Sequence, residues 1–254
     1  FFAILATIMI PFQAIMLPAK TSASLQPADI PVIIYNGSIN FARIVTGNID
    51  IRNTQAGISL ANNIFNIRNL RTRAFDGRVR GNISMNLITS LLNIRLTGRG
   101  IDVEKALLDA AGMKDTLSGT AAFETDISLK GATYEEQMRS LKGTVGFDVR
   151  NGQFGPFGKL ENLIIAENIR ESQLFQTALG GVISGLTTID TTHFSELKGT
   201  LSFNDGICNL KPVTSLGNIL SLHIAGEFDL LRNYADMKVR ARMASLVSNL
   251  LGPI

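Results

Sequence analysis

The chain has 254 residues, 45% of them hydrophobic and 18% charged, a composition that excludes a mainly disordered protein and suffices for a sizeable core. Its 24 basic and 21 acidic residues are spread along the sequence and give a net charge of +3, so we expect no nucleic-acid partner. Cys208 is the single cysteine, so no internal disulfide can form. Cysteine usage therefore indicates neither an oxidising nor a reducing compartment.

The N-terminal stretch, residues 1–17, carries no charge and is interrupted by Pro11 and Gln13. Its length lies close to the lower limit for a transmembrane helix, which needs ~17 to 25 residues. A membrane-anchor remnant, a signal-peptide core and a buried strand all fit this pattern, and we favour a membrane-targeting role. Three prolines in residues 18–31 predict an extended linker, followed by a β-rich domain over residues 32–254.

The first half of this domain shows short apolar segments separated by turn signals about 8 to 12 residues apart, which favours an antiparallel meander. Tight turns are predicted at Asn36–Gly37 and at Asp76–Gly77, because glycine adopts the positive φ that such turns need. The expected strands cover residues 32–35, 39–45, 48–53, 57–61, 64–71, 78–86 and 91–98.

Helices are expected to interrupt the strands. Asp102 has the character of an N-cap for a helix over residues 103–111, and Gly112 would end it. Thr133 and Glu136 have the spacing of a capping box for a second short helix. A longer segment with apolar residues at helical spacing comes third. The predicted helical insertions therefore lie near residues 102–112, 134–141 and 157–186.

The phrase Leu-x-Gly-Thr occurs three times, beginning at Leu117, Leu141 and Leu197, and each copy is predicted to start a strand. Apolar residues alternate with polar ones after the phrase, so each strand has one apolar face. The three leucines themselves are interpreted as anchors between helix and sheet. Further strands are expected at residues 200–203, 207–210, 220–230 and 236–243.

An apolar sheet face must be covered by another layer or by a ligand. The expected helices are too few to cover every strand, which leaves a second sheet, a closed barrel or lipid as the covering material. If lipid covers the face, acyl chains would lie along it, and each buried methylene would contribute roughly 0.8 kcal/mol to the binding free energy. In the alternative, the same residues form the core of a β-sandwich. The candidate lipid-groove residues are Phe123, Ile127, Leu129, Val145, Phe147, Val149, Leu201, Phe203, Leu222, Ile224 and Phe228.

The sequence contains no recognisable catalytic, metal or cofactor motif. His193 and His223 lack Cys, Asp or Glu at the spacing of metal ligands, and no serine stands in a Gly-x-Ser-x-Gly context. We therefore expect a protein that is not an enzyme and holds no metal or cofactor.

The densest basic stretch alternates arginines with other residues. A solvated polar strand face is the favoured interpretation, and contact with phosphate or lipid head groups is the alternative. The arginines of this stretch are Arg68, Arg71, Arg73, Arg78 and Arg80.

Several short motifs recur in a fixed order. They comprise Phe-Asp-Gly-Arg at 75–78 ahead of Gly81, the glycine-bounded helix at 100–112, Leu-x-Gly-Thr at 117–120 and 141–144, and Asn-Gly at 151–152. Weaker matches continue through 197–200, Asp205–Gly206 and the strand at 226–229. In this order and spacing the chain resembles the C-terminal region of AsmA-family proteins, over most of its length.

This resemblance implies a mainly β fold with short helical insertions, in which a curved, predominantly antiparallel sheet forms an open groove or taco-like half-barrel. It also implies a Gram-negative envelope protein of the inner membrane with a periplasmic domain, which passes lipid acyl chains and supports outer-membrane assembly and lipid homeostasis. The expected partners are phospholipid or another envelope lipid, the membrane and other envelope proteins. The family's long β region is mostly missing here, which suggests the terminal piece of a longer groove. A structural β-module that binds no lipid is the alternative.

Overall fold

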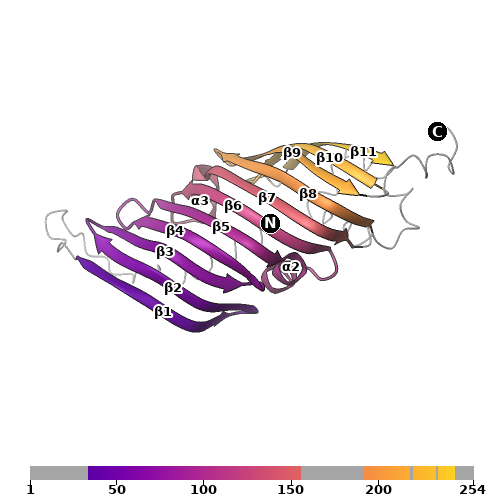
Figure 1. Cartoon of the computed structure of the whole chain (residues 1–254). Coiled ribbons are helices and arrows are strands. Elements are labelled where there is room, and N and C mark those ends of the chain that lie inside the picture. Colours follow the sequence, from indigo (N-terminus) through magenta and orange to yellow (C-terminus); the bar gives the residue numbers. More distant parts are fainter. Residues whose placement is uncertain (1–33, 156–191, 218–219, 233, 244–254) are drawn as a thin grey trace.

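The computed structural model describes residues 34–155, 192–217, 220–232 and 234–243, which form one antiparallel sheet (Figure 1). The sheet has eleven strands, and each strand pairs with its neighbours in sequence, so the topology is a simple meander. Its strands are β1 (Tyr35–Thr46), β2 (Ile49–Ala61), β3 (Ile64–Ala74), β4 (Gly77–Asn86), β5 (Leu92–Asp102), β6 (Leu117–Leu129), β7 (Lys142–Phe154), β8 (Thr192–Asn204), β9 (Ile207–Gly217), β10 (Leu220–Asp229) and β11 (Tyr234–Met243).

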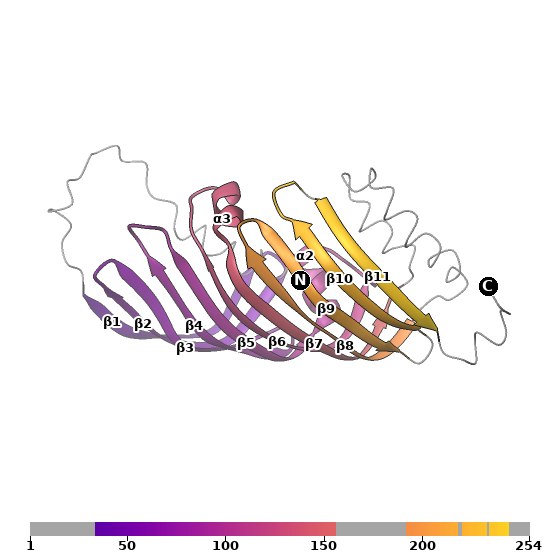
Figure 2. The same ribbon diagram turned by 90° about the horizontal axis from the view of Figure 1, so that it is seen from above.

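The sheet is open, because β1 and β11 form its two ends and do not pair with each other. Figure 2 shows that the strands bend, so that the sheet curves into a trough whose long axis crosses the strands. The predicted fold class, mainly β with a curved, antiparallel, open sheet, is confirmed.

Two short helices lie at opposite rims of the trough, since one follows β5 and the other follows β6. Helix α2 (Val103–Ala111) begins as predicted: the Asp102 carboxylate accepts a hydrogen bond of 3.0 Å from the backbone N–H of Lys105. Gly112 ends it in the left-handed conformation, with φ of 67°. The apolar residues of α2 pack against β5 and β6, and this contact fixes the helix on the sheet.

Helix α3 (Tyr134–Ser140) contains the predicted capping box. The Thr133 hydroxyl accepts from the backbone N–H of Glu136 at 3.2 Å, and the Glu136 carboxylate accepts from the N–H of Thr133 at 3.3 Å. The Glu136 carboxylate also accepts from the backbone N–H of Ala132 at 2.8 Å, and this bond, followed by that from Thr133, lowers the pKa of Glu136. The cap satisfies donors that a helix of 7 residues would otherwise leave open.

Other predicted segments lie outside the described residues: the stretch 1–17, the linker 18–31 and the helical insertion at 157–186. None of the helices in the described ranges has the length and hydropathy of a membrane-spanning segment.

Two predicted interruptions between strands near the start of the domain are wrong. Asn36 and Gly37 lie inside β1, where they pair with Ser59 and Ile58, so they form no turn. The segments 48–53 and 57–61 belong to one strand, β2, which continues through a bulge where Asn53 has φ of 53°. Pairing along the full length of both strands outweighs these local turn preferences.

The turn between β3 and β4 lies one residue earlier than predicted. Its two positive-φ residues are Phe75 and Asp76, at 51° and 60°, whereas Gly77 already belongs to β4. Gly77 is required for a different reason: a Cβ there would stand 2.5 Å from the Cδ1 atom of Ile101. The close approach of β5 therefore explains this glycine. Asp205 and Gly206 form the turn between β8 and β9, with φ of 49° and 82°.

The three Leu-x-Gly-Thr phrases have different positions in the sheet. Leu117 begins β6 and Leu141 immediately precedes β7, as predicted, but the third phrase lies in the middle of β8, which already begins at Thr192. Leu117 and Leu197 contact a cluster that contains Val103 of α2, and this agrees with an anchoring role between helix and sheet.

Candidate functional site: the apolar inner face

The pairing register places the eleven candidate lipid-groove residues on one face of the sheet. Directly opposed residues of antiparallel strands point to the same side. Phe123 pairs with Phe147, Val145 pairs with Leu201, and Leu201 pairs in turn with Leu210. The remaining candidates follow by the same registers or by alternation along their strands: Ile127 and Leu129 on β6, Val149 on β7, Phe203 on β8, and Leu222, Ile224 and Phe228 on β10.

The apolar face continues into strands from which we predicted no site residue. Ile127 pairs with Ile94 of β5, Ile94 with Ile83 of β4, and Ile83 with Ile67 of β3. On β2, Ile58 pairs with Ile67. The same alternation of apolar and polar residues was visible in the sequence, but only the register shows that these strands extend one surface.

The opposite face is polar. Arg95 and Asp126 lie there as a cross-strand ion pair of 3.0 Å, with side chains 74% and 61% exposed. Arg150 with Asp148 on β7 and Lys198 with Glu196 on β8 form ion pairs within one strand, each at 2.9 Å. We call this side the outer face and the apolar side the inner face.

The inner face is the concave one. Helix α2 packs on it through Val103, Ala106 and Leu107, and Figure 2 shows α2 on the inner side of the curve. In the described residues α2 and α3 are the helices that contact this face, and no second sheet covers it. An inward bend makes the side chains of the concave face converge, which removes them from water.

Burial divides the candidates into two groups. Side chains in the floor are almost fully buried, as for Val145 at 0% and Phe203 at 2% exposure. The others keep part of their surface accessible. The floor group is Ile127, Leu129, Val145, Val149, Leu201 and Phe203, and the accessible group is Phe123, Phe147, Leu222, Ile224 and Phe228. A ligand on the inner face would therefore first meet the accessible group.

Two phenylalanines of the accessible group lie against glycines of the next strand. A Cβ at Gly98 would stand 2.1 Å from a ring carbon of Phe123, and one at Gly199 would stand 3.1 Å from a ring carbon of Phe147. The aromatic ring thus covers backbone that glycine leaves bare. The ring of Phe123 occupies the space that a side chain at position 98 would need, which explains the glycine there.

Few polar groups interrupt the inner face. Thr54 and Thr72 satisfy each other through a hydrogen bond of 2.8 Å. Ser215 is 1% exposed and its hydroxyl has no hydrogen-bond partner among the described residues. No charged side chain is buried in the part of the chain that the structure describes. The surface is suited to hydrocarbon and offers no ionic group to a polar substrate.

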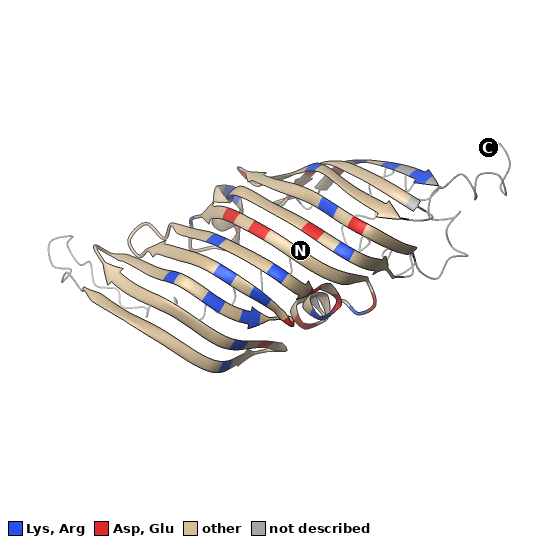
Figure 3. Cartoon of the chain, viewed as in Figure 1, with Lys and Arg blue, Asp and Glu red and all other residues tan. Residues whose placement is uncertain are grey.

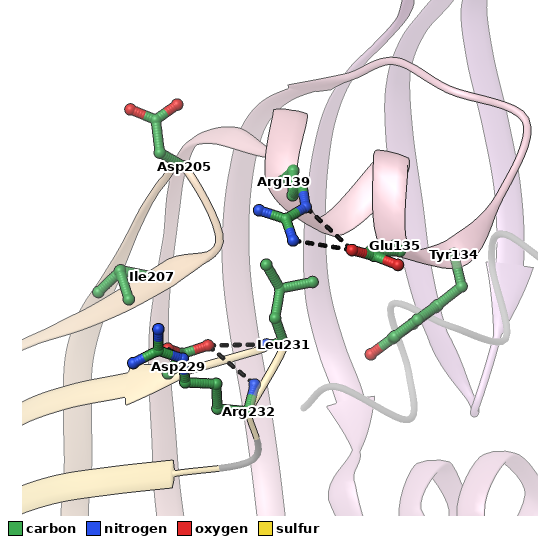
Figure 4. A pocket seen from close by; sticks show the side chains of 8 residues that line it. All are labelled: Tyr134, Glu135, Arg139, Asp205, Ile207, Asp229, Leu231 and Arg232. Carbon is green, nitrogen blue, oxygen red and sulfur yellow. Dashed lines mark hydrogen bonds and ion pairs between the residues drawn. The ribbon is translucent and has the colours of Figure 1, made fainter.

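A separate depression of about 610 Å³ lies at the rim near α3 (Figure 4). Its charged groups are paired: Arg139 binds Glu135 at 2.8 Å, and Arg232 lies 3.7 Å from Asp229. The backbone N–H groups of Arg232 and Leu231 donate to Asp229 and lower its pKa, that of Arg232 being the larger cause. These charged groups are therefore held by one another, and Asp229 is held also by the backbone of the turn after β10.

The cysteine and histidine side chains among the described residues are Cys208, His193 and His223. Burial raises the pKa of the Cys208 thiol to about 11, so the nucleophilic thiolate is suppressed. His193 and His223 are exposed, and the described residues contain no group of three potential metal ligands.

In the described residues, the protein is therefore built on one open antiparallel sheet with an apolar concave face. The family model described as AsmA family matches residues 23–213, and the chain belongs to the AsmA family, as predicted. Membership associates the chain with the cell envelope. Comparison with curated proteins and with solved structures gives no match for this chain.

Proposed function

We propose that this protein holds lipid acyl chains on its inner face and passes them along the trough, without catalysis and without a cofactor. The observation that carries the proposal is the continuity of the apolar face from β2 to β10, with no second sheet over it in the described residues. A layer of hydrocarbon would supply the apolar cover that such a face needs.

The dimensions of the sheet fit this role. Eleven strands give ten intervals, which at ~4.8 Å each make a trough ~48 Å long. One leaflet of a ~30 Å hydrocarbon core is ~15 Å thick, so about three acyl-chain lengths fit end to end. Each methylene that moves from water onto the face contributes roughly 0.8 kcal/mol, and a chain that slides along a uniform face exchanges equivalent contacts.

The cellular setting belongs to the same proposal. In a Gram-negative envelope the protein would associate with the inner membrane, present its sheet to the periplasm, and support outer-membrane assembly and lipid homeostasis. Its partners would be phospholipid or another envelope lipid, the membrane and other envelope proteins. Membership of the AsmA family supports this setting.

One observation favours the alternative, a structural envelope module that binds no lipid. The floor residues, among them Val145 and Ile127 at 0% and 1% exposure, already behave as a packed core. The two functions therefore differ at the accessible group, which contacts lipid in the first case and water or protein in the second.

Photo-crosslinking separates them. A crosslinking amino acid replaces Phe147, which is partly buried on the inner face, and in a matched variant of the same strand it replaces Lys142, which lies exposed on the outer face. We expect lipid adducts at 147 and none at 142 after irradiation in cells. Equal labelling of the two positions, or no lipid at 147 in a folded protein, would contradict the proposal.

A further inference from the structure

The outer face carries a cluster of arginines on three neighbouring strands, which we call the arginine patch. It contains Arg71 and Arg73 on β3, Arg78 and Arg80 on β4, and Arg99 on β5. All five are exposed, and Figure 3 shows basic positions gathered on adjacent strands in this half of the sheet. From the sequence pattern we favoured a solvated polar face here, with contact to phosphate or lipid head groups as the alternative.

The register brings these like charges directly opposite each other. Arg73 pairs with Arg78, and Arg78 pairs with Arg99, which makes a row across three strands. Arg71 pairs with Arg80 two residues further along. Directly opposed like charges destabilise a sheet, so folding stability does not account for this arrangement.

Several other cations of the outer face are neutralised by carboxylates. Arg43 and Arg52 both bind Asp50, at 3.0 and 2.5 Å, and the bond from Arg52 is the main reason that the pKa of Asp50 falls to about 2. In contrast, none of the five patch arginines has an acidic partner among the described residues. Their charge is available to an external anion.

Four of the five arginines line a depression of about 590 Å³ together with the turn between β3 and β4. Asp76 is the one carboxylate in this lining, and both of its oxygens lie 3.1 Å from the Nζ atom of Lys105 on α2. Because Lys105 neutralises Asp76, the depression presents net positive charge.

The chemistry of this site points to phosphate. Guanidinium groups bind phosphate oxygens with two parallel hydrogen bonds, and arginine is preferred where such recognition matters. Neighbouring strands lie ~4.8 Å apart and alternate residues of a strand ~7 Å apart, so the patch is wider than a single phosphate. It matches several phosphate groups presented side by side.

We propose that the arginine patch binds the phosphate groups of anionic lipid head groups at a membrane surface. The charge complementarity between five unneutralised arginines and an anionic surface carries this proposal. The site lies on the outer face, and its function is independent of acyl chains on the inner face. It would orient the trough by holding its β3–β5 region against the membrane.

The test measures partition of the 254-residue protein onto vesicles of phosphatidylcholine with and without 30% phosphatidylglycerol. The ratio of the two partition coefficients cancels any apolar contribution that the two vesicle types share. Each arginine near an anionic surface is worth about a fivefold change in partition. The triple variant Arg73→Gln, Arg78→Gln, Arg80→Gln should therefore lower the ratio about a hundredfold, and 0.5 M salt should lower the wild-type ratio strongly.

A matched control removes the same charge from the same face. The variant Arg95→Gln, Arg150→Gln, Lys198→Gln removes three cations that already have carboxylate partners, and it should change the ratio by less than about fivefold. If both variants lower the ratio of partition coefficients equally, only the net charge of the protein matters, and the proposed site is wrong.

Pyrophosphate supplies the second arm, measured by calorimetry on the same proteins. Binding of wild type to anionic vesicles, with loss in the patch variant, supports the lipid surface whether or not pyrophosphate competes. Pyrophosphate binding that the patch variant loses, without any preference for anionic vesicles, would assign the site to a soluble phosphate and overturn the membrane proposal. Crosslinking of lipid at position 147 in the patch variant tests the inner face separately, so the two proposals can fail independently.

Discussion

Truncation of Leu201 tests whether the inner face is an open surface or an enclosed core. Leu201 is 6% exposed and lies between Val145 and Leu210 in the centre of the sheet. Leu201→Ala removes three carbons, and at ~0.8 kcal/mol each the lost transfer free energy is about 2.4 kcal/mol. A site enclosed on every side would add a cavity term and raise the loss toward about 5 kcal/mol. Since no second sheet covers Leu201 in the part of the chain that the structure describes, we expect a loss of about 2 to 3 kcal/mol.

The assay is urea unfolding of the detergent-free protein, followed by circular dichroism. Leu216→Ala is the matched control, since Leu216 lies on the adjacent strand, is 50% exposed and should cost less than about 0.5 kcal/mol. A loss of 4.5 kcal/mol or more for Leu201→Ala would mean a closed core, and a loss equal to the control would mean that Leu201 is not buried. Either result refutes the single-layer description.

Three further predictions concern local chemistry. Thr133→Ala removes the hydroxyl that caps α3 and should cost about 1 kcal/mol of unfolding free energy, measured against Thr133→Ser, which keeps the cap. The pKa of Asp50 is lowered in the folded protein to about 2, chiefly by the hydrogen bond from Arg52, whereas an unfolded Asp titrates near ~3.9. The ionised Asp50 carboxylate therefore adds to the free energy of unfolding fully above about pH 5, and this stabilisation is lost as the pH falls toward 2. In the Asp50→Asn variant, the free energy of unfolding should depend less steeply on pH in this acidic range. Cys208 should react with a maleimide at pH 8 only after denaturation, because burial raises its pKa to about 11, and rapid labelling of the native protein would contradict its position.

The helices were predictable because their signals are local. Asp102 with Gly112, and Thr133 with Glu136, act within one turn of the chain, so their sequence spacing determines the cap geometry. The turn at Asn36–Gly37 failed for the opposite reason: its residues pair with β2, and pairing depends on a partner more than twenty residues away.

The inner face was predictable as a set of residues but not as a surface. Alternation after Leu117 and Leu141 indicates which side chains share a face, yet a sandwich, a barrel and an open trough all produce the same alternation. The partner of that face is a property of the whole sheet. The arginine patch shows the same limit, because Arg99 joins Arg78 only through the register of β4 with β5.

The most direct test of the central claim is lipid analysis of the purified 254-residue protein. The protein is isolated in two detergents of different chemistry, and bound lipid is extracted, identified and counted by mass spectrometry. The same preparation of Phe147→Asp, which places a charge among the accessible residues of the inner face, serves as the comparison. We predict at least one phospholipid per chain in the wild type in both detergents and a loss of most of it in the folded variant. Wild-type protein without lipid in both detergents, or equal lipid in the folded variant, would contradict the claim that the inner face holds acyl chains.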